Sequence, residues 1–483
     1  MRKIIRMVIK MKDRYNKLID FFKEISKIPR NSKCEEKIAD YLCDFAKKRN
    51  LWYKKDKNNN VIIKRKASIG YENKNTILFQ AHTDMVCVKT KESKHDFSKD
   101  PIEIIQNERI LKAKDTSLGA DDGIGVAILM LLLDENEIKL PNIECLFTTE
   151  EEIGMNGARS FNYSDIEAKY LINLDGEEEN TAIVGCAGGV TTEYTKEVNI
   201  SECKDKKVYT LEINGLYGGH SGVDIDKGRM NSNYLAANLL DDIKDIEIIS
   251  WKGGTKDNAI ANSTSVIFAS SNDSFKDLID NKVESLDVTE EDAGLLVLIH
   301  ENKKSAKFNS ISNKDSLSII ELILNLKQNV IEWSKDVKGL VETSGNIGVV
   351  DVSDGKIKII ESLRSSVDEK RDIIKEENNL VASGLGFNIK ESGQYPGWKY
   401  NPNSILEKVY INSYKNSHNG KEPIVCAIHA GVECGMIFEK LPNLDMISLG
   451  PDVKDVHTVN ETLYLDSCKS LLNTLFDMII NLD

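Results

Sequence analysis

Carboxylates and imidazoles stand at five places in the sequence where they could bind a divalent cation. These places are His82 with Asp84, Asp121 with Asp122, the run Glu150 to Glu152, Asp175, and His457. Carboxylate oxygen and imidazole nitrogen are the donors that zinc, cobalt and manganese accept in proteins. If the fold brings these places together, the sequence predicts a metal site.

Each place alone also has an ordinary structural explanation. A histidine two residues from an aspartate is often only hydrogen-bonded to it, and acids at the start of an apolar helix, such as Asp121 and Asp122, serve as caps. A lone His457 is more often structural. Three adjacent carboxylates after a buried strand repel one another and are costly to desolvate, so they indicate either a solvated acidic turn or a site where cations gather them.

The segments that carry these residues read as an α/β sheet. Strands are expected at 76–80, 143–148 and 170–174, and a helix at 123–133. Their apolar stretches are short and bounded by polar turns, which is typical of buried strands. Ligands bind at the carboxyl ends of strands in open α/β sheets, and the candidate ligands follow those ends.

The middle of the chain has a different pattern of predicted strands and helices. A strand at 208–213 and a helix at 230–246 open one copy of a plan of strand, helix, two strands and helix, and a strand at 295–300 and a helix at 317–333 open a second. Each copy is a split βαβ unit. After the turn-rich segment 395–402 the pattern of the first domain returns.

The predicted architecture is therefore an α/β catalytic domain with a mixed sheet flanked by helices, interrupted by an inserted α+β lid domain of two split βαβ units. The catalytic domain comprises 1–187 and 397–483, and the insertion, a lid or dimerisation domain, comprises 188–396. A chain of 483 residues exceeds the size at which single cores stop growing, which agrees with two domains.

Composition excludes several classes of partner. The 64 Lys and Arg against 77 Asp and Glu give a net charge of −13, which opposes binding to nucleic acid or anionic lipid. The longest apolar run, 126–133, is too short to span a membrane. Nine cysteines without a CxxC pair indicate reduced thiols and a cytoplasmic location.

The five places, in this order, resemble the co-catalytic dizinc peptidases of the aminoacylase and carboxypeptidase G type. The runs FQAHTDMV, SLGADDGIG, TTEEEIGMNGA, LINLDGEEE, VGCAGG, GLYGGHSGVDI, YPGWKYNPNS, AIHAGVECGM and DMISLGP resemble more closely one family of them, the aminoacyl-histidine dipeptidases of the peptidase D type. The resemblance extends over about residues 15–480. It implies hydrolysis of small Xaa-His peptides, two metal ions, most simply zinc with cobalt or manganese as alternatives, and a homodimer.

Carried over by motif position, the resemblance gives each residue a role. His82, Asp121 and Asp175 bind one metal, and Asp121 is shared with a second metal that Glu152 and His457 also bind. Glu151 is the general base. Asp84 orients His82 through its other ring nitrogen. Val459-Asn460 departs from the family's Pro-Asp after the histidine, which makes His457 the least typical ligand.

Further residues are assigned to the substrate. His220, in Gly218-Gly-His-Ser-Gly222, resembles the family histidine that stabilises the oxyanion. Arg364 suits bidentate capture of a substrate carboxylate, although a surface role explains it equally well. Asn258 is expected to enter the site, and His429 and Glu433 are expected to line the pocket or bind the substrate amine.

Other readings remain open at this point. The same chemistry serves a tripeptidase, a broad aminopeptidase or dipeptidase, or an amidohydrolase of N-acyl amino acids. A metal-binding homologue without catalysis would lack the base or a ligand, and this chain has both types of residue. The native metal, the residue preference on either side of the cleaved bond, the oligomeric interface and the role of the N-terminal extension do not follow from the sequence.

Overall fold

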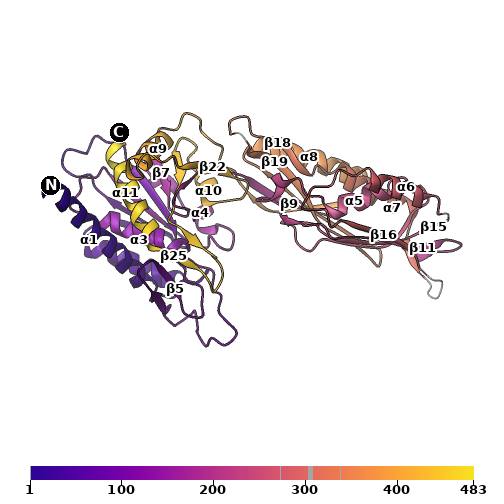
Figure 1. Cartoon of the computed structure of the whole chain (residues 1–483), viewed down its shortest axis with the longest axis horizontal. Helices are drawn as coiled ribbons and strands as arrows, with labels where there is room; N and C mark the ends of the chain where they lie inside the picture. Colours follow the sequence, from indigo (N-terminus) through magenta and orange to yellow (C-terminus); the bar gives the residue numbers. More distant parts are fainter. Residues whose placement is uncertain (1, 272, 303–307, 338, 483) are drawn as a thin grey trace. The chain divides into compact units, whose positions relative to one another are not determined.

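The computed structural model describes residues 2–482 except 272, 303–307 and 338. The chain forms two compact units. Unit 1 comprises Met1–Cys186, Lys399–Ala427 and Val432–Asp483, and unit 2 comprises Ala187–Trp398 and Ile428–Gly431. The indigo beginning and the yellow end of the chain therefore belong to one unit (Figure 1). The sequence does not indicate the short return of 428–431 to unit 2.

Unit 1 is built on a mixed eight-stranded sheet with the order β1-β2-β6-β3-β7-β23-β8-β22. In that order the strands are Trp52–Lys55, Val61–Arg65, Ile143–Thr148, Ile77–His82, Tyr170–Asn173, Asp445–Ser448, Thr181–Cys186 and Ile424–Ile428. Strands β6, β3, β7 and β23 run parallel. Every residue of β3, β6 and β7 is buried, which explains why their sequences are apolar without alternation.

Helices cover this sheet on both faces. They are α1 (Arg2–Ile25), α2 (Glu36–Lys48), α3 (Ala120–Asp134), α4 (Asn156–Ser160), α9 (Ile405–Ser417), α10 (Glu433–Lys440) and α11 (Leu465–Asn481). Helix α3 is apolar on all sides because it packs between α1 and β3. Consecutive strand residues point to opposite faces, and both Leu78 and Phe79 are fully buried, so neither face of β3 is open to solvent.

A small second sheet in unit 1 joins two distant parts of the sequence. Its strands are β24 (Val453–Lys454), β25 (Thr462–Tyr464), β5 (Ile110–Ala113) and β4 (Ile104–Gln106), in that order. Strand β25 pairs with β5 in an antiparallel register. This pairing brings the segment after His457 beside the segment that leads to Asp121.

Unit 2 has a nine-stranded antiparallel sheet with the order β16-β11-β15-β13-β19-β20-β9-β21, and β18 pairs with β19. In that order the strands are Leu296–Glu301, Lys207–Asn214, Thr264–Ser270, Glu247–Gly253, Val341–Ser353, Lys356–Ser365, Gly188–Glu197 and Asn388–Tyr395, with β18 at Asn329–Trp333. Short pairs form between β10 (Ile200–Glu202) and β17 (Asn309–Ile311), and between β12 (Gly219–His220) and β14 (Ala259–Ile260).

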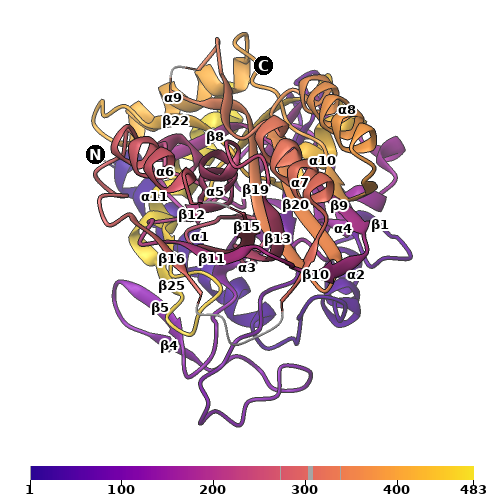
Figure 2. The ribbon, with the colours of Figure 1, turned by 90° about the vertical axis from the view of Figure 1, so that its right-hand side faces the viewer.

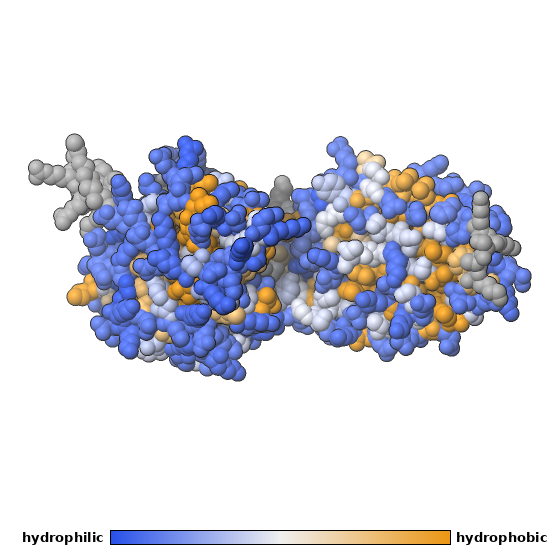
Figure 3. Space-filling view, turned by 90° about the horizontal axis from the view of Figure 1, so that it is seen from below, coloured by the Kyte–Doolittle hydropathy of each residue, from blue (hydrophilic) through white to orange (hydrophobic). Residues whose placement is uncertain are grey.

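One face of this sheet is covered and the other is open. Helices α5 (Ser232–Leu240), α6 (Phe275–Glu284), α7 (Asn313–Asn325) and α8 (Asp368–Gly384) lie side by side on the covered face, as Figures 1 and 2 show. They enclose a core with Tyr209, Trp251 and Phe268. On the open face polar and apolar side chains are mixed (Figure 3), and Leu296 and Leu298 are nearly half exposed.

The predicted repeat exists, but its copies are divided differently from the expectation. One copy is β11-α5-β13-β15-α6-β16. The other copy is split in the sequence: it begins with β9, before the first copy, and continues after the first copy with α7-β19-β20-α8-β21. The two halves of the sheet then have equivalent strand orders. The expected strand at 295–300 therefore closes the first copy instead of opening the second. Its pairing with β11 is long-range, and local sequence does not reveal it.

Two helices are shorter than predicted. The helix expected at 317–333 is α7, which ends at Asn325, and 329–333 is strand β18. Leu326, directly after α7, has φ of −60° and ψ of 128°, an extended conformation that ends the helix. The helix expected at 230–246 is α5, which ends at Leu240. The predicted fold class, an α/β unit with an inserted α+β unit, is confirmed.

Candidate metal centre

Three strand ends converge at one edge of the sheet in unit 1. Strand β3 ends at His82, which is paired in register with Thr148 at the end of the parallel strand β6. The glutamates follow Thr148 directly. On the other side β3 pairs with β7, and Asp175 lies two residues beyond the end of β7. Parallel strands thus bring side chains from three separate segments to one place.

The first cluster contains His82, Asp121 and Asp175. The Nε2 atom of His82 lies 3.0 Å from Oδ1 of Asp121 and 3.3 Å from Oδ1 of Asp175. His82 is only 1% exposed. One atom from each residue lies within 4.8 Å of the other two, a spacing that a single cation can bridge.

The second cluster contains Asp121, Glu152 and His457. The Nε2 atom of His457 lies 3.0 Å from Oδ2 of Asp121 and 2.9 Å from Oε2 of Glu152. Asp121 therefore presents one carboxylate oxygen to His82 and the other to His457. A carboxylate placed in this way can hold two cations at once.

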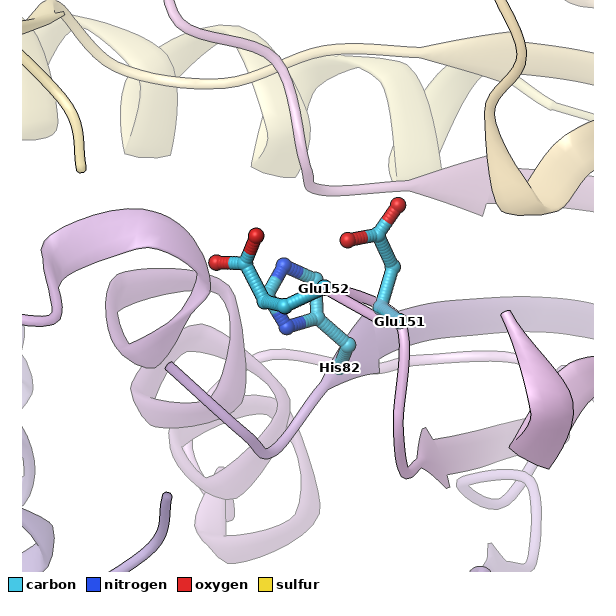
Figure 4. A group of neighbouring side chains, drawn as sticks. All are labelled: His82, Glu151 and Glu152. Carbon is cyan, nitrogen blue, oxygen red and sulfur yellow. The ribbon is translucent and has the colours of Figure 1, made fainter. Parts of the chain in front are cut away.

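The backbone of the glutamate run is held by Asp84. Its Oδ1 accepts the N–H of Glu151 at 3.1 Å, and its Oδ2 accepts the N–H of Glu152 at 3.3 Å. Oδ1 of Asp84 also lies 3.5 Å from Nδ1 of His82. Figure 4 shows the carboxylates of Glu151 and Glu152 extending to the same side of the loop, beside the ring of His82. His82, Glu151 and Glu152 also offer ligand atoms within 4.8 Å of one another.

The electrostatics of this edge favour cations. Burial, reinforced by neighbouring carboxylates, raises the pKa of Glu151 to about 8 and that of Asp175 to about 7. Hydrogen bonds to Asp121 and Glu152 raise the pKa of His457 to about 10. Glu151 and Asp175 resist ionisation because they are buried and because neighbouring carboxylates add repulsion. Two divalent cations would relieve it, and the donor set is the one such cations require, so these residues fit a two-metal centre.

Asp122 differs from its neighbour Asp121. Its Oδ1 accepts the N–H of Gly125 at 3.1 Å, and its Oδ2 accepts the N–H of His82 at 3.2 Å. Capping therefore accounts for Asp122, while Asp121 turns toward the two histidines.

A second group of candidate residues lies in unit 2. His220 is on strand β12, and its Nδ1 accepts the N–H groups of Gly222 and Val223, both at 3.1 Å. The proton of the neutral ring must then be on Nε2. Burial, together with the charge of Arg364, lowers the pKa of His220, so its ring is neutral at physiological pH.

Arg364 and His429 are also buried in unit 2. Nη1 of Arg364 donates to the hydroxyl of Tyr395 at 2.7 Å, while its buried Nε has no hydrogen-bond partner among the described residues. Nε2 of His429 lies 2.7 Å from the hydroxyl of Ser344. Burial and the charge of Arg364 lower the pKa of His429 to about 3. Tyr395, which contacts Arg364, was interpreted from sequence only as part of a turn.

Two predicted substrate residues have other surroundings. Asn258 is exposed, and its carbonyl accepts the N–H of Ser221, beside His220. Glu433 is fully buried, and its Oε2 accepts hydrogen bonds from Gln80 at 2.6 Å and Thr148 at 2.7 Å. Glu433 therefore lies beneath the strand ends of unit 1, where burial and the nearby Glu151 raise its pKa to about 8.

The clustered donors could hold metal ions, and sequence comparison identifies the class of enzyme. A family model described as peptidase family M20/M25/M40 matches residues 78–481. The chain therefore belongs to this peptidase family.

Individual relatives agree with this assignment. The chain is 34% identical over 464 residues to the cytosol non-specific dipeptidase of Escherichia coli (strain K12), covering 93% of this chain and 94% of the relative. The crystal structure of aminoacylhistidine dipeptidase from Vibrio alginolyticus superposes with a TM-score of 0.91 at 32% identity over 96% of both chains. An aminopeptidase PepT from Bacillus cereus shares the fold with a TM-score of 0.55 at 15% identity, covering 97% of this chain and 99% of that one.

Within the described part of the chain, no helix has the length and apolar character needed to cross a membrane.

Proposed function

We propose that the chain is a dipeptidase that uses two divalent cations, most simply zinc, to hydrolyse Xaa-His dipeptides. The observation that carries the proposal is the position of Asp121, whose two oxygens face His82 and His457 separately. His82, Asp121 and Asp175 would hold one cation, and Asp121, Glu152 and His457 the other. When bound, such cations polarise a peptide carbonyl and make water more acidic.

Glu151 is the proposed general base. Its carboxylate lies close to the proposed ligands, but Glu151 belongs to neither of the two clusters that share Asp121. It accepts a proton from the water that attacks the peptide carbonyl and then donates this proton to the leaving amine. Asp84 keeps Glu151 and Glu152 in place through their backbone N–H groups and orients His82.

The residues of unit 2 would bind the substrate. Nε2–H of His220 is the free donor of a neutral ring, which suits a developing oxyanion. Arg364, held by Tyr395, has donors left for a substrate carboxylate. His429 and Asn258 lie in the same unit near Arg364 and His220 respectively. Unit 2 would serve as a lid or dimerisation domain, in a cytoplasmic homodimer, as the resemblance to this family suggests.

Preference for histidine at the second position is supported by the relative from Vibrio alginolyticus, whose name is aminoacylhistidine dipeptidase. A second candidate is a dipeptidase of broad specificity, which the name of the Escherichia coli relative favours. The two relatives are similarly distant, so the choice depends on a measurement.

The decisive assay uses the purified chain with zinc, cobalt or manganese and a panel of β-alanyl-histidine, other Xaa-His dipeptides, dipeptides without histidine, tripeptides and acetylated amino acids. The proposal predicts metal-dependent cleavage in which Xaa-His dipeptides have the highest kcat/KM. Equal rates on all dipeptides would establish the broad alternative, and hydrolysis of only tripeptides or acetylated amino acids would contradict both.

A further inference from the structure

A buried carboxylate outside both ligand clusters controls the segment that carries Asp121. Glu461 is 3% exposed and accepts four successive backbone N–H groups. Its Oε2 accepts Leu118 at 2.8 Å and Gly119 at 2.9 Å, and its Oε1 accepts Ala120 at 2.7 Å and Asp121 at 3.3 Å. These N–H groups open helix α3 and would otherwise have no acceptor. One side chain thus fixes the backbone of the shared ligand.

A buried cation holds the same segment through its carbonyls. Arg30 is 2% exposed, and its Nη1 donates to the carbonyls of Thr83 at 3.0 Å and Asp84 at 3.1 Å. Its Nη2 donates to the carbonyl of Gly119. A Cβ atom at Gly119 or Gly123 would lie 2.5 Å from this nitrogen, so both positions leave room only for the guanidinium. Arg30 therefore joins the segment after His82 to the segment before Asp121.

Glu461 also connects the segment of His457 to the segment of Asp121. It lies four residues after His457, and strand β25, which begins at Thr462, pairs with β5 in the segment before α3. The segment of His457 and the segment of Asp121 therefore share one carboxylate. Because the two oxygens of Asp121 must face two different histidines, a small rotation of its backbone would misdirect one of them.

We propose that Glu461 and Arg30 are positioning residues for the second cation: Glu461 holds the segments of Asp121 and His457 together, and Arg30 holds the segment that leads to Asp121. This inference rests on the proposed metal centre. Groups that orient metal ligands change metal affinity when they are replaced, commonly about 10-fold to 100-fold. Substitution of Glu461 should therefore cost more free energy in binding of the second cation than in unfolding of the metal-free chain.

The test compares Glu461→Gln with a matched control. Asp445 also accepts the N–H groups that open a helix, those of Ile405 at 2.7 Å and Leu406 at 2.9 Å, but α9 carries no candidate ligand. Asp445→Asn should remove a similar cap without touching the metal centre. The metal-free chains are titrated with Zn²⁺ by calorimetry, their urea unfolding is measured, and kcat is measured at limiting and at excess Zn²⁺.

The expected result is that Glu461→Gln binds the second Zn²⁺ about 10-fold to 100-fold more weakly and recovers most of its kcat at excess Zn²⁺. Asp445→Asn should bind both ions as the wild type does. If Glu461→Gln does not fold, Arg30→Lys supplies the test, since a lysine ammonium cannot donate to three carbonyls in the same planar geometry.

Unchanged Zn²⁺ affinities in a folded Glu461→Gln or Arg30→Lys chain would overturn the inference, as would an equal loss in Asp445→Asn. A wild-type chain that binds fewer than two Zn²⁺ would instead refute the metal centre itself, so the two failures can be told apart.

Discussion

The candidate site residues of the two units lie in different electrostatic environments. In unit 1 carboxylates are crowded at a buried sheet edge, and burial raises the pKa of Glu151 to about 8 and of Asp175 to about 7. In unit 2 burial and Arg364 lower the pKa of His220, and the same causes lower that of His429 to about 3. Unit 1 is suited to hold cations, and unit 2 offers neutral and cationic donors to anions. Substitutions in the two units should therefore fail in different ways.

The largest effect is expected from Glu151→Gln. Loss of a general base should lower kcat about 10³-fold, while metal content stays the same because Glu151 belongs to neither cluster that shares Asp121. Metal analysis and steady-state kinetics check this. Glu150→Gln is the control, since the Glu150 carboxylate binds Asn156 and should not affect turnover. Near-normal hydrolysis by Glu151→Gln would remove it from the mechanism.

His220→Ala should come next, with about a 10²-fold lower kcat and full metal content. The reason is that the substitution removes Nε2–H, the donor proposed to stabilise the oxyanion. Nitrogen chemical shifts should place the proton of wild-type His220 on Nε2 around neutral pH. His300→Ala, at an exposed position of β16, should be silent. Loss of metal in His220→Ala, or a proton on Nδ1, would contradict this role.

Arg364→Gln should have a smaller effect that depends on the substrate. Loss of a charged hydrogen bond to the substrate carboxylate should raise KM about 10-fold to 100-fold for a dipeptide with a free carboxyl terminus. The wild type should cleave the C-terminally amidated dipeptide slowly, and the variant should cleave it at a similar rate. An equal loss on both substrates would show that Arg364 has a structural role instead.

The smallest effect concerns stability and contrasts the carboxylates of the two units. Burial raises the pKa of Glu361 in unit 2 from 4.5 to about 7, opposed by hydrogen bonds from Tyr194 and Asn378. A raised folded pKa means that the stabilisation is complete below pH 4.5 and is lost as pH rises through 7. Urea unfolding should show a wild-type loss of about 2 kcal/mol between pH 5 and 8.

Glu361→Gln mimics the protonated acid and should lose about 2 kcal/mol less stability than the wild type over this range. The same loss in the variant would assign the pH dependence to other groups.

The sequence predicted unit 1 better than unit 2, and the reason is physical. The strands that end at His82 or lead to Glu152 and Asp175 are buried on both faces, so they appear as apolar runs followed by candidate ligands. In unit 2 strand β9 is separated from α7 by a complete copy of the repeat, and the pairing that reveals this division, β9 with β20 and β21, is long-range.

Side chains that act through the backbone were also missed. Arg30 and Glu461 contact carbonyl and N–H groups, which exist at every residue, so no residue type marks their partners. Asp84 was recognised only because it belongs to a motif with His82.

A calorimetric Zn²⁺ titration of the metal-free chain tests most directly whether Asp121 binds both cations. We predict two ions for the wild type, loss of one tight site in Asp175→Asn, loss of the other in Glu152→Gln, and weakening of both in Asp121→Asn. A wild type that binds a single ion, or an Asp121→Asn chain that loses only one site, would contradict the account.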